Sequence, residues 1–140
     1  MKKIKRIISK ETDYAIRLLI KLIQLNKPVS INYLSQNLYV NKPMLIKIIQ
    51  MLKTKNLILT KKGKNGGIMI NREYLYINVY EILQKLDNAY DIGCCNDFDG
   101  KCCRLKRTCM ASKLFNECKT FIDNKLRQVK LKDLVYENIN

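Results

Sequence analysis

The sequence contains no histidine. This absence excludes proton transfer by an imidazole and every metal site that needs a histidine ligand. Two motifs typical of enzymes are also missing, because the chain has neither a nucleophile elbow nor a phosphate-binding glycine loop. We therefore expect that this protein is not an enzyme.

Long apolar runs are absent as well. No stretch approaches the ~20 apolar residues of a membrane-spanning helix. Segment 1–10 is basic, but no apolar signal-peptide core follows it, since Glu11, Asp13 and Arg17 interrupt the next positions. We expect a cytoplasmic protein without a membrane partner.

Acidic residues are few. The chain has 12 Asp and Glu against 27 Lys and Arg, for a formal net charge of +15. Such an excess of positive charge repels itself, and a polyanion would relieve the repulsion. Nucleic acid is therefore the leading candidate partner, and a solubilising surface in a lysine-rich proteome is the alternative.

The apolar residues of the first part recur at helical spacing. They predict one helix over 12–26, a short helix after residue 30, and a third helix that ends near Lys55. The expected N-terminal caps are Ser9 or Thr12, Ser30 and Asn41. The expected buried positions of the second and third helices are Ile31, Leu34, Leu38, Leu45, Ile48, Ile49 and Leu52. Pro43 is tolerated in the first turn of the third helix.

The turn 39–41 joins two of these helices, and the second of them has a basic face. This arrangement is typical of a helix-turn-helix, although any small helical hairpin would show the same pattern. Two short strands follow, 57–60 and 68–70, around a basic turn that contains Gly66-Gly67. A β-hairpin directly after a helix-turn-helix predicts the wing of a winged helix.

The last part of the chain predicts two more helices. One begins near Asn78, which with Glu81 forms a plausible capping pair. The other runs from about Leu105 to Val129, and its continuous apolar stripe includes Cys118, interpreted as a core cysteine. A helix of this length has little to pack against in its own small domain, which favours a homodimer interface.

Five of the six cysteines lie within segment 94–109. In a reducing compartment, such a group is more typical of a metal or redox site than of a disulfide scaffold. The thiolates could hold an iron–sulfur cluster or zinc, or the loop could switch between thiol and disulfide. The candidate metal ligands are Cys94, Cys95, Cys102, Cys103 and Cys109.

Several segments together resemble the Rrf-two family of transcription regulators. Residues 10–17 resemble the family's opening segment, and 43–58 its recognition helix and exit. Gly63 and Gly66-Gly67 match the wing glycines, and 129–134 is similar to the closing segment. The resemblance covers nearly the whole chain. It implies a homodimeric winged-helix protein that binds a two-fold-related site on double-stranded DNA.

Some members of this family bind an iron–sulfur cluster through three cysteines in the loop after the fourth helix. Five residues separate Cys103 from Cys109, as in those members, whereas the doubled pairs Cys94-Cys95 and Cys102-Cys103 depart from the pattern. Certain members add a histidine three residues after the last cysteine, where this chain has Ser112. Others use an aspartate of the partner's first helix, which Asp13 matches.

The expected fold class is thus mainly α. Residues 1–87 would form a winged helix-turn-helix DNA-binding domain with a small β-hairpin wing. Residues 88–110 would form a cysteine-rich cluster-binding loop, and 104–140 a long dimerisation helix with a C-terminal segment. The resemblance favours an iron–sulfur cluster, 2Fe-2S over 4Fe-4S, as a sensor of redox state, nitric oxide or iron. Zinc or a thiol/disulfide switch is the alternative.

Two sets of site residues remain to be placed. Asp13 is a candidate cluster ligand, but it can instead pair with Arg17 in the first turn of a helix. The family pattern places DNA contacts near the start of the third helix and on the wing. The favoured DNA-binding residues are Asn41, Lys42, Lys47, Lys61, Lys62 and Lys64.

Overall fold

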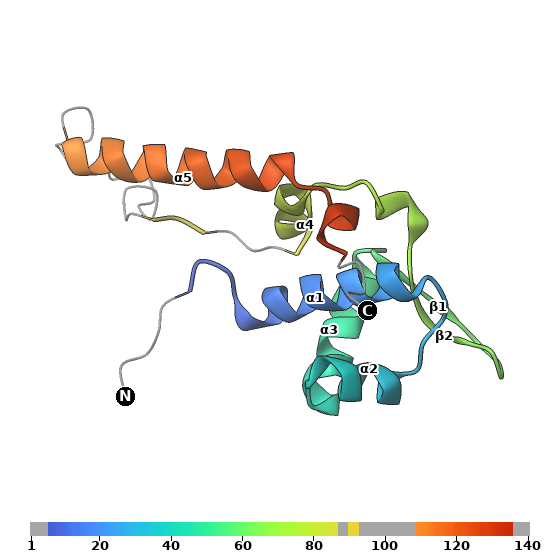
Figure 1. The fold of residues 1–140 in the computed structure, drawn as a ribbon. Helices are drawn as coiled ribbons and strands as arrows, with labels where there is room; N and C mark the ends of the chain where they lie inside the picture. Colours follow the sequence, from blue (N-terminus) through green and yellow to red (C-terminus); the bar gives the residue numbers. More distant parts are fainter. Residues whose placement is uncertain (1–5, 87–89, 93–108, 136–140) are drawn as a thin grey trace, which may run out of the picture.

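A computed structural model describes residues 6–86, 90–92 and 109–135. The helices α1 (Lys10–Leu25), α2 (Ile31–Leu38) and α3 (Lys42–Thr54) come first. The strands β1 (Ile58–Lys61) and β2 (Gly67–Ile70) and the short 3-10 helix η1 (Arg72–Tyr74) follow. The chain continues with α4 (Val79–Lys85), α5 (Met110–Gln128) and the 3-10 helix η3 (Leu131–Leu134). Figure 1 shows α1, α2, α3 and the hairpin as one unit, with α5 extending beside it.

Helix α1 is the central helix of the core. Ser9 caps it, because the Ser9 hydroxyl accepts the backbone N–H of Thr12 at 3.1 Å. Its inner face is fully buried at Ala15, Leu18, Leu19 and Leu22. The helix ends at Asn26, whose left-handed backbone lets its N–H reach the carbonyl of Leu22. The prediction of 12–26 is confirmed within two residues at each end.

Helices α2 and α3 form the predicted helix-turn-helix. Ser30 and Asn41 cap them as expected, with their side chains accepting from Tyr33 N–H and Met44 N–H. The predicted core face of α3 is buried at Leu45, Ile48, Ile49 and Leu52. Of the three positions expected to be buried in α2, Leu34 is fully buried and Leu38 is half-buried against the core, but the expectation for Ile31 is wrong, since it is 36% exposed.

The hairpin is held to the helices through the segment before α2. Strands β1 and β2 pair antiparallel, and Val29 adds a bridge to Ile68 through hydrogen bonds of 2.8 and 2.9 Å. A Cβ on Gly67 would lie 2.5 Å from the Val29 carbonyl oxygen, and Gly67 has φ +147°. A Cβ on Gly66 would lie even closer to backbone, 2.1 Å from the Lys61 carbonyl oxygen, so both glycines permit a close approach of backbone.

The C-terminal segment returns to the first domain. Asn78 caps α4 by accepting from Glu81 N–H. Val79 N–H donates to the carbonyl of Val129, and Leu131 N–H donates to that of Ile77. Leu131 is fully buried in the same core cluster as the face of α1. The segment after α5 is thus fixed to α4 and to the core around α1.

Helix α5 differs from its prediction in two respects. It begins at Met110, because Cys109 has extended backbone (φ −78°, ψ 108°), so the expected start near Leu105 is wrong. Cys118 is exposed in the single chain, so its interpretation as a core cysteine is wrong as well. Leu114, Phe115 and Phe121 of the same stripe are 55%, 39% and 74% exposed. In the described part of the chain, no helix is long and apolar enough to cross a membrane.

Candidate nucleic-acid interface and cysteine loop

The outer face of α3 is basic and exposed. Lys42 and Lys47, both expected to contact DNA, lie on this face. Ile46 lies between them and is 43% exposed, which offers an apolar contact beside the two charges. The Asn41 side-chain oxygen accepts from Met44 N–H at 2.9 Å, so Asn41 holds the start of α3 in place.

Lys47 is the one predicted DNA-binding lysine with a described ion pair. Its Nζ lies 3.5 Å from Oε1 of Glu11, in the first turn of α1. A backbone hydrogen bond and the Lys47 charge together lower the pKa of Glu11, so this carboxylate is ionised at neutral pH. Glu11 thus competes with any phosphate for the same ammonium group.

The hairpin presents the other three predicted contacts. Lys61 ends β1, and Lys62 and Lys64 lie in the turn before β2. All three side chains are exposed. Figure 1 shows the hairpin projecting at the end of the domain that lies away from the beginning of α5. A basic hairpin beside a recognition helix suits contacts to backbone phosphates.

Asp13 pairs with Arg17, which was the alternative to its role as a cluster ligand. Its Oδ1 accepts from Nε of Arg17 at 3.0 Å, one turn further along α1. The two side chains are 51% and 64% exposed, so this pair contributes little to stability. Asp13 remains accessible to a ligand or to another chain.

Cys109 is the one candidate cysteine ligand in the described part of the chain. It is a half-buried free thiol that precedes α5 and makes no capping hydrogen bond. Cys94, Cys95, Cys102 and Cys103 lie outside the described residues. Among the residues that are described, no group of three or more Cys, Asp or Glu could hold a metal ion.

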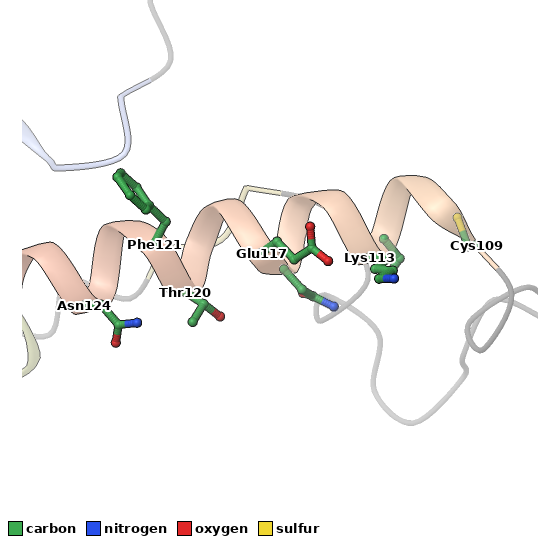
Figure 2. Close-up of a pocket in the computed structure, with 8 residues that line it drawn as sticks. Cys109, Lys113, Glu117, Thr120, Phe121 and Asn124 are labelled. Carbon is green, nitrogen blue, oxygen red and sulfur yellow. The ribbon is translucent and has the colours of Figure 1, made fainter.

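Cys109 and Asp13 belong to helix starts that lie apart. In Figure 1 the beginning of α5 projects past the unit formed by α1, α2 and α3, well away from the beginning of α1. Figure 2 shows Cys109 at one end of a row of side chains along α5 that continues to Asn124. These side chains line an open hollow of about 650 Å³.

A polar network missed by sequence reasoning joins the segment before the cysteine loop to α5. The Tyr90 hydroxyl donates to Oδ1 of Asp123, and Lys119 Nζ donates to Oδ2 at 2.9 Å. Lys119 also lies 5.0 Å from the centre of the Tyr90 ring. The spacing of Lys119 and Asp123 at i,i+4 was the only available signal, since Tyr90 lies far away in sequence.

The network shifts the pKa of each of its three members. Partial burial opposes ionisation of Asp123, but hydrogen bonds from Tyr90 and Lys119 outweigh it and lower the pKa of this carboxyl. Burial, and then the bond to Asp123, raises the pKa of Tyr90. The hydrogen bond to Asp123 also raises the pKa of Lys119. The ionised carboxylate therefore accepts two hydrogen bonds across the neutral range.

Comparison with known families identifies the chain. A sequence model of the Rrf2 family, described as an iron-dependent transcriptional regulator, matches residues 8–137. The chain belongs to the Rrf2 family. The resemblance to Rrf-two regulators that was drawn from segments 10–17 and 43–58 is thereby confirmed.

Solved structures show the same fold as this Rrf2 protein. T. potens IscR is 21% identical with a TM-score of 0.68, over 91% of this chain and 84% of that chain. CymR, the global cysteine regulator of B. subtilis, is 18% identical with a TM-score of 0.67, over 96% and 97%. Staphylococcus aureus CymR is 17% identical with a TM-score of 0.68, over 94% and 100%. The predicted mainly α winged-helix fold is confirmed.

Proposed function

We propose that this Rrf2 protein is a homodimeric transcription regulator that binds double-stranded DNA through α3 and the hairpin. The observation that carries the proposal is the exposed basic face formed by Lys42 and Lys47 on α3, with further lysines on the hairpin. Membership in a family of transcriptional regulators supports it. Selection of duplexes from a randomised library tests it, because a dimer should enrich a two-fold-related sequence.

Helix α5 would form the dimer interface. Its side chains Leu114, Phe115 and Phe121 are exposed in the single chain, and Phe121 also lines the hollow drawn in Figure 2. A second copy of α5 offers the apolar surface that would cover this stripe. Cys118 would then be buried between subunits, which would account for its place in an apolar pattern.

An iron–sulfur cluster would be held by Cys109, one cysteine of the pair Cys94-Cys95 and one of Cys102-Cys103. Thiolates are the ligands such clusters require. The helix start at Cys109 favours a negatively charged sulfur, because backbone N–H groups there lack intrahelical partners. Asp13 of the partner subunit would complete the set, since the two helix starts lie apart within one chain.

The proposed site would connect the dimer helix to the first helix of the other subunit. When bound, such a cluster supplies a centre that is sensitive to nitric oxide or oxidants. Asp13 shares the first turn of α1 with Glu11, which contacts Lys47 of the recognition helix. A change at Asp13 would therefore alter the position of α3 through the contact between Glu11 and Lys47. Two recognition helices must match a groove repeat of about 34 Å, so a small shift would weaken specific binding.

Anaerobic purification tests the cluster. We expect a brown protein that contains iron and acid-labile sulfide. A colourless protein loaded with zinc, or a metal-free protein whose DNA binding follows thiol oxidation, would contradict the cluster and support the alternative switch.

Asp13→Ala tests the ligand from the partner subunit. We expect an altered visible absorption spectrum and faster loss of iron. Arg17→Ala is the matched control, because it breaks the same ion pair and keeps the carboxylate. Identical spectra of Asp13→Ala and the wild-type protein would remove Asp13 from the ligand set.

A further inference from the structure

Tyr39 has an unusual place in the turn of the helix-turn-helix. It caps the C-terminal end of α2 with left-handed backbone (φ 53°, ψ 38°), and its side chain is 94% exposed. A bulky side chain with positive φ is a steric outlier. An exposed aromatic ring gains little from burial that could offset this strain.

The rest of the described chain provides the comparison. Only two other non-glycine residues there have positive φ, and both are asparagines, Asn26 and Asn56. Asparagine tolerates this backbone conformation well, which is why it is common at helix ends. Tyrosine at position 39 is therefore the exception, and strain of this kind is concentrated at functional positions.

The surrounding turn holds Tyr39 in this conformation. Val40 is buried, its N–H donates to the carbonyl of Ser35, and its own carbonyl accepts the Ser35 hydroxyl at 2.7 Å. Asn41 caps the recognition helix immediately afterwards. The ring is thus directed to solvent within two residues of the start of α3, where a helix-turn-helix meets the edge of the major groove.

We propose that Tyr39 contacts DNA, with its phenol O–H donating to a backbone phosphate oxygen at the edge of the groove. This inference rests on the proposed function. Tyrosine hydroxyls are among the groups that position proteins on the phosphate backbone without reading sequence. The contact would fix the register of α3, which carries Lys42 and Lys47.

Contact with a protein partner is the alternative role for the exposed Tyr39 ring. Tyr39 lies at the rim of an open groove whose lining includes Ile16, Ile20 and Leu38. The same lining also contains Asp13, Arg17 and Lys21, so the groove is not a continuous apolar surface. The adjacent capped and basic helix start favours a polyanion instead.

Tyr39→Phe tests the hydrogen bond. The probe is the duplex selected from the randomised library, and a scrambled duplex of equal length is measured beside it. Loss of one hydrogen bond to a charged group should weaken binding by about tenfold on both duplexes. The slope of log affinity against log salt should not change, because a tyrosine hydroxyl carries no positive charge and releases no counterion. In contrast, Lys47→Ala should reduce that slope by about one per contacted phosphate.

Tyr39→Gly tests whether the ring is needed for folding. It should leave the midpoint of thermal unfolding equal or higher, because glycine relieves the backbone strain, and it should weaken DNA binding at least as much as Tyr39→Phe. A clearly lower midpoint would show that Tyr39 has a packing role and would overturn the inference. Wild-type affinity in both variants would also overturn it while leaving the proposed function intact. If the wild-type protein binds neither duplex, the proposed function fails and the inference fails with it.

Discussion

At the scale of single residues, one ion pair joins α1, which carries the proposed cluster ligand, to α3, which carries proposed DNA contacts. Glu11 and Asp13 share the first turn of α1, yet their partners differ. Asp13 pairs within its own helix, whereas Glu11 reaches across to Lys47 of α3. The carboxylate of Glu11 therefore connects the turn that holds Asp13, the proposed cluster ligand, to Lys47, a proposed DNA contact.

Glu11→Gln should strengthen DNA binding, because it frees Lys47 to contact a phosphate and removes a negative charge beside the duplex. An exposed pair of this kind predicts a gain of roughly two- to fivefold, measured by fluorescence anisotropy. Glu73→Gln is the control, since it removes the same charge from η1 on an exposed side chain. Equal gains in the two variants would show that net charge alone is responsible.

Gly67→Ala should destabilise the hairpin more than Gly63→Ala. Both glycines have positive φ, so both substitutions introduce backbone strain of about 1 kcal/mol. Only at Gly67 would the new Cβ also collide with the Val29 backbone, whereas it meets nothing within 4 Å at Gly63. Urea unfolding of both variants measures the difference. Equal losses would mean that the contact between β2 and Val29 is not close in solution.

At the scale of elements, the hydrogen bonds of Asp123 with Tyr90 and Lys119 make the free energy of unfolding depend on pH. The folded state lowers the pKa of Asp123 below its ordinary value of 3.8. Its contribution is therefore present above that value and is lost as pH falls through the lowered pKa. Asp123→Asn should lower the free energy of unfolding by about 1 kcal/mol at neutral pH.

The difference between wild type and Asp123→Asn should shrink as pH falls below 3.8, the ordinary value for this carboxyl. Thermal unfolding across the acid range measures it. Glu117→Gln serves as a charge-matched control on an exposed residue of the same helix. A deficit that stays constant into strong acid would show that packing, and not the ionised carboxylate, connects Tyr90 to α5.

Local signals predicted the elements well. Ser30, Asn41 and Asn78 were identified as caps because their side chains bond to backbone only three residues away. Signals that depend on the rest of the molecule were weaker. Periodicity could not show that Ile31 of the short α2 has no neighbour to bury it. Nor could it show that Phe121 remains exposed, because helical spacing does not reveal which elements pack against a stripe.

The candidate site was predicted unevenly for the same reason. The lysines of α3 and the hairpin are exposed as expected, because a basic face follows directly from helical spacing. The Tyr90–Asp123 bond joins residues 33 positions apart, and no local pattern indicates it. The strain at Tyr39 was also missed, since a three-residue turn does not by itself reveal which residue has positive φ.

At the scale of the whole molecule, the proposed regulator first requires dimerisation through α5. Phe121→Glu should raise the dimer dissociation constant by at least about tenfold, because a charge would be buried in an apolar interface. Sedimentation equilibrium measures it. Leu59→Glu on β1 is the control, since Leu59 is also exposed, at 48%, but lies on the hairpin. A Phe121→Glu protein that stays dimeric would place the interface elsewhere.

The net charge of +15 acts over the whole molecule and favours association with any duplex, particularly at low salt. Specific binding must therefore be judged as the ratio of affinities for the selected duplex and a scrambled one. That ratio depends on the spacing of the two recognition helices, which is the quantity the cysteine loop is proposed to control.

The most direct measurement is the affinity for the selected duplex in three states of the anaerobically isolated protein: intact, treated with nitric oxide, and cluster-free through Cys109→Ser. Control of DNA binding by the cysteine loop predicts that the intact state differs from the other two by roughly 5- to 150-fold. The scrambled duplex should show little change. Equal affinity of all three states for the selected duplex would contradict the proposed control.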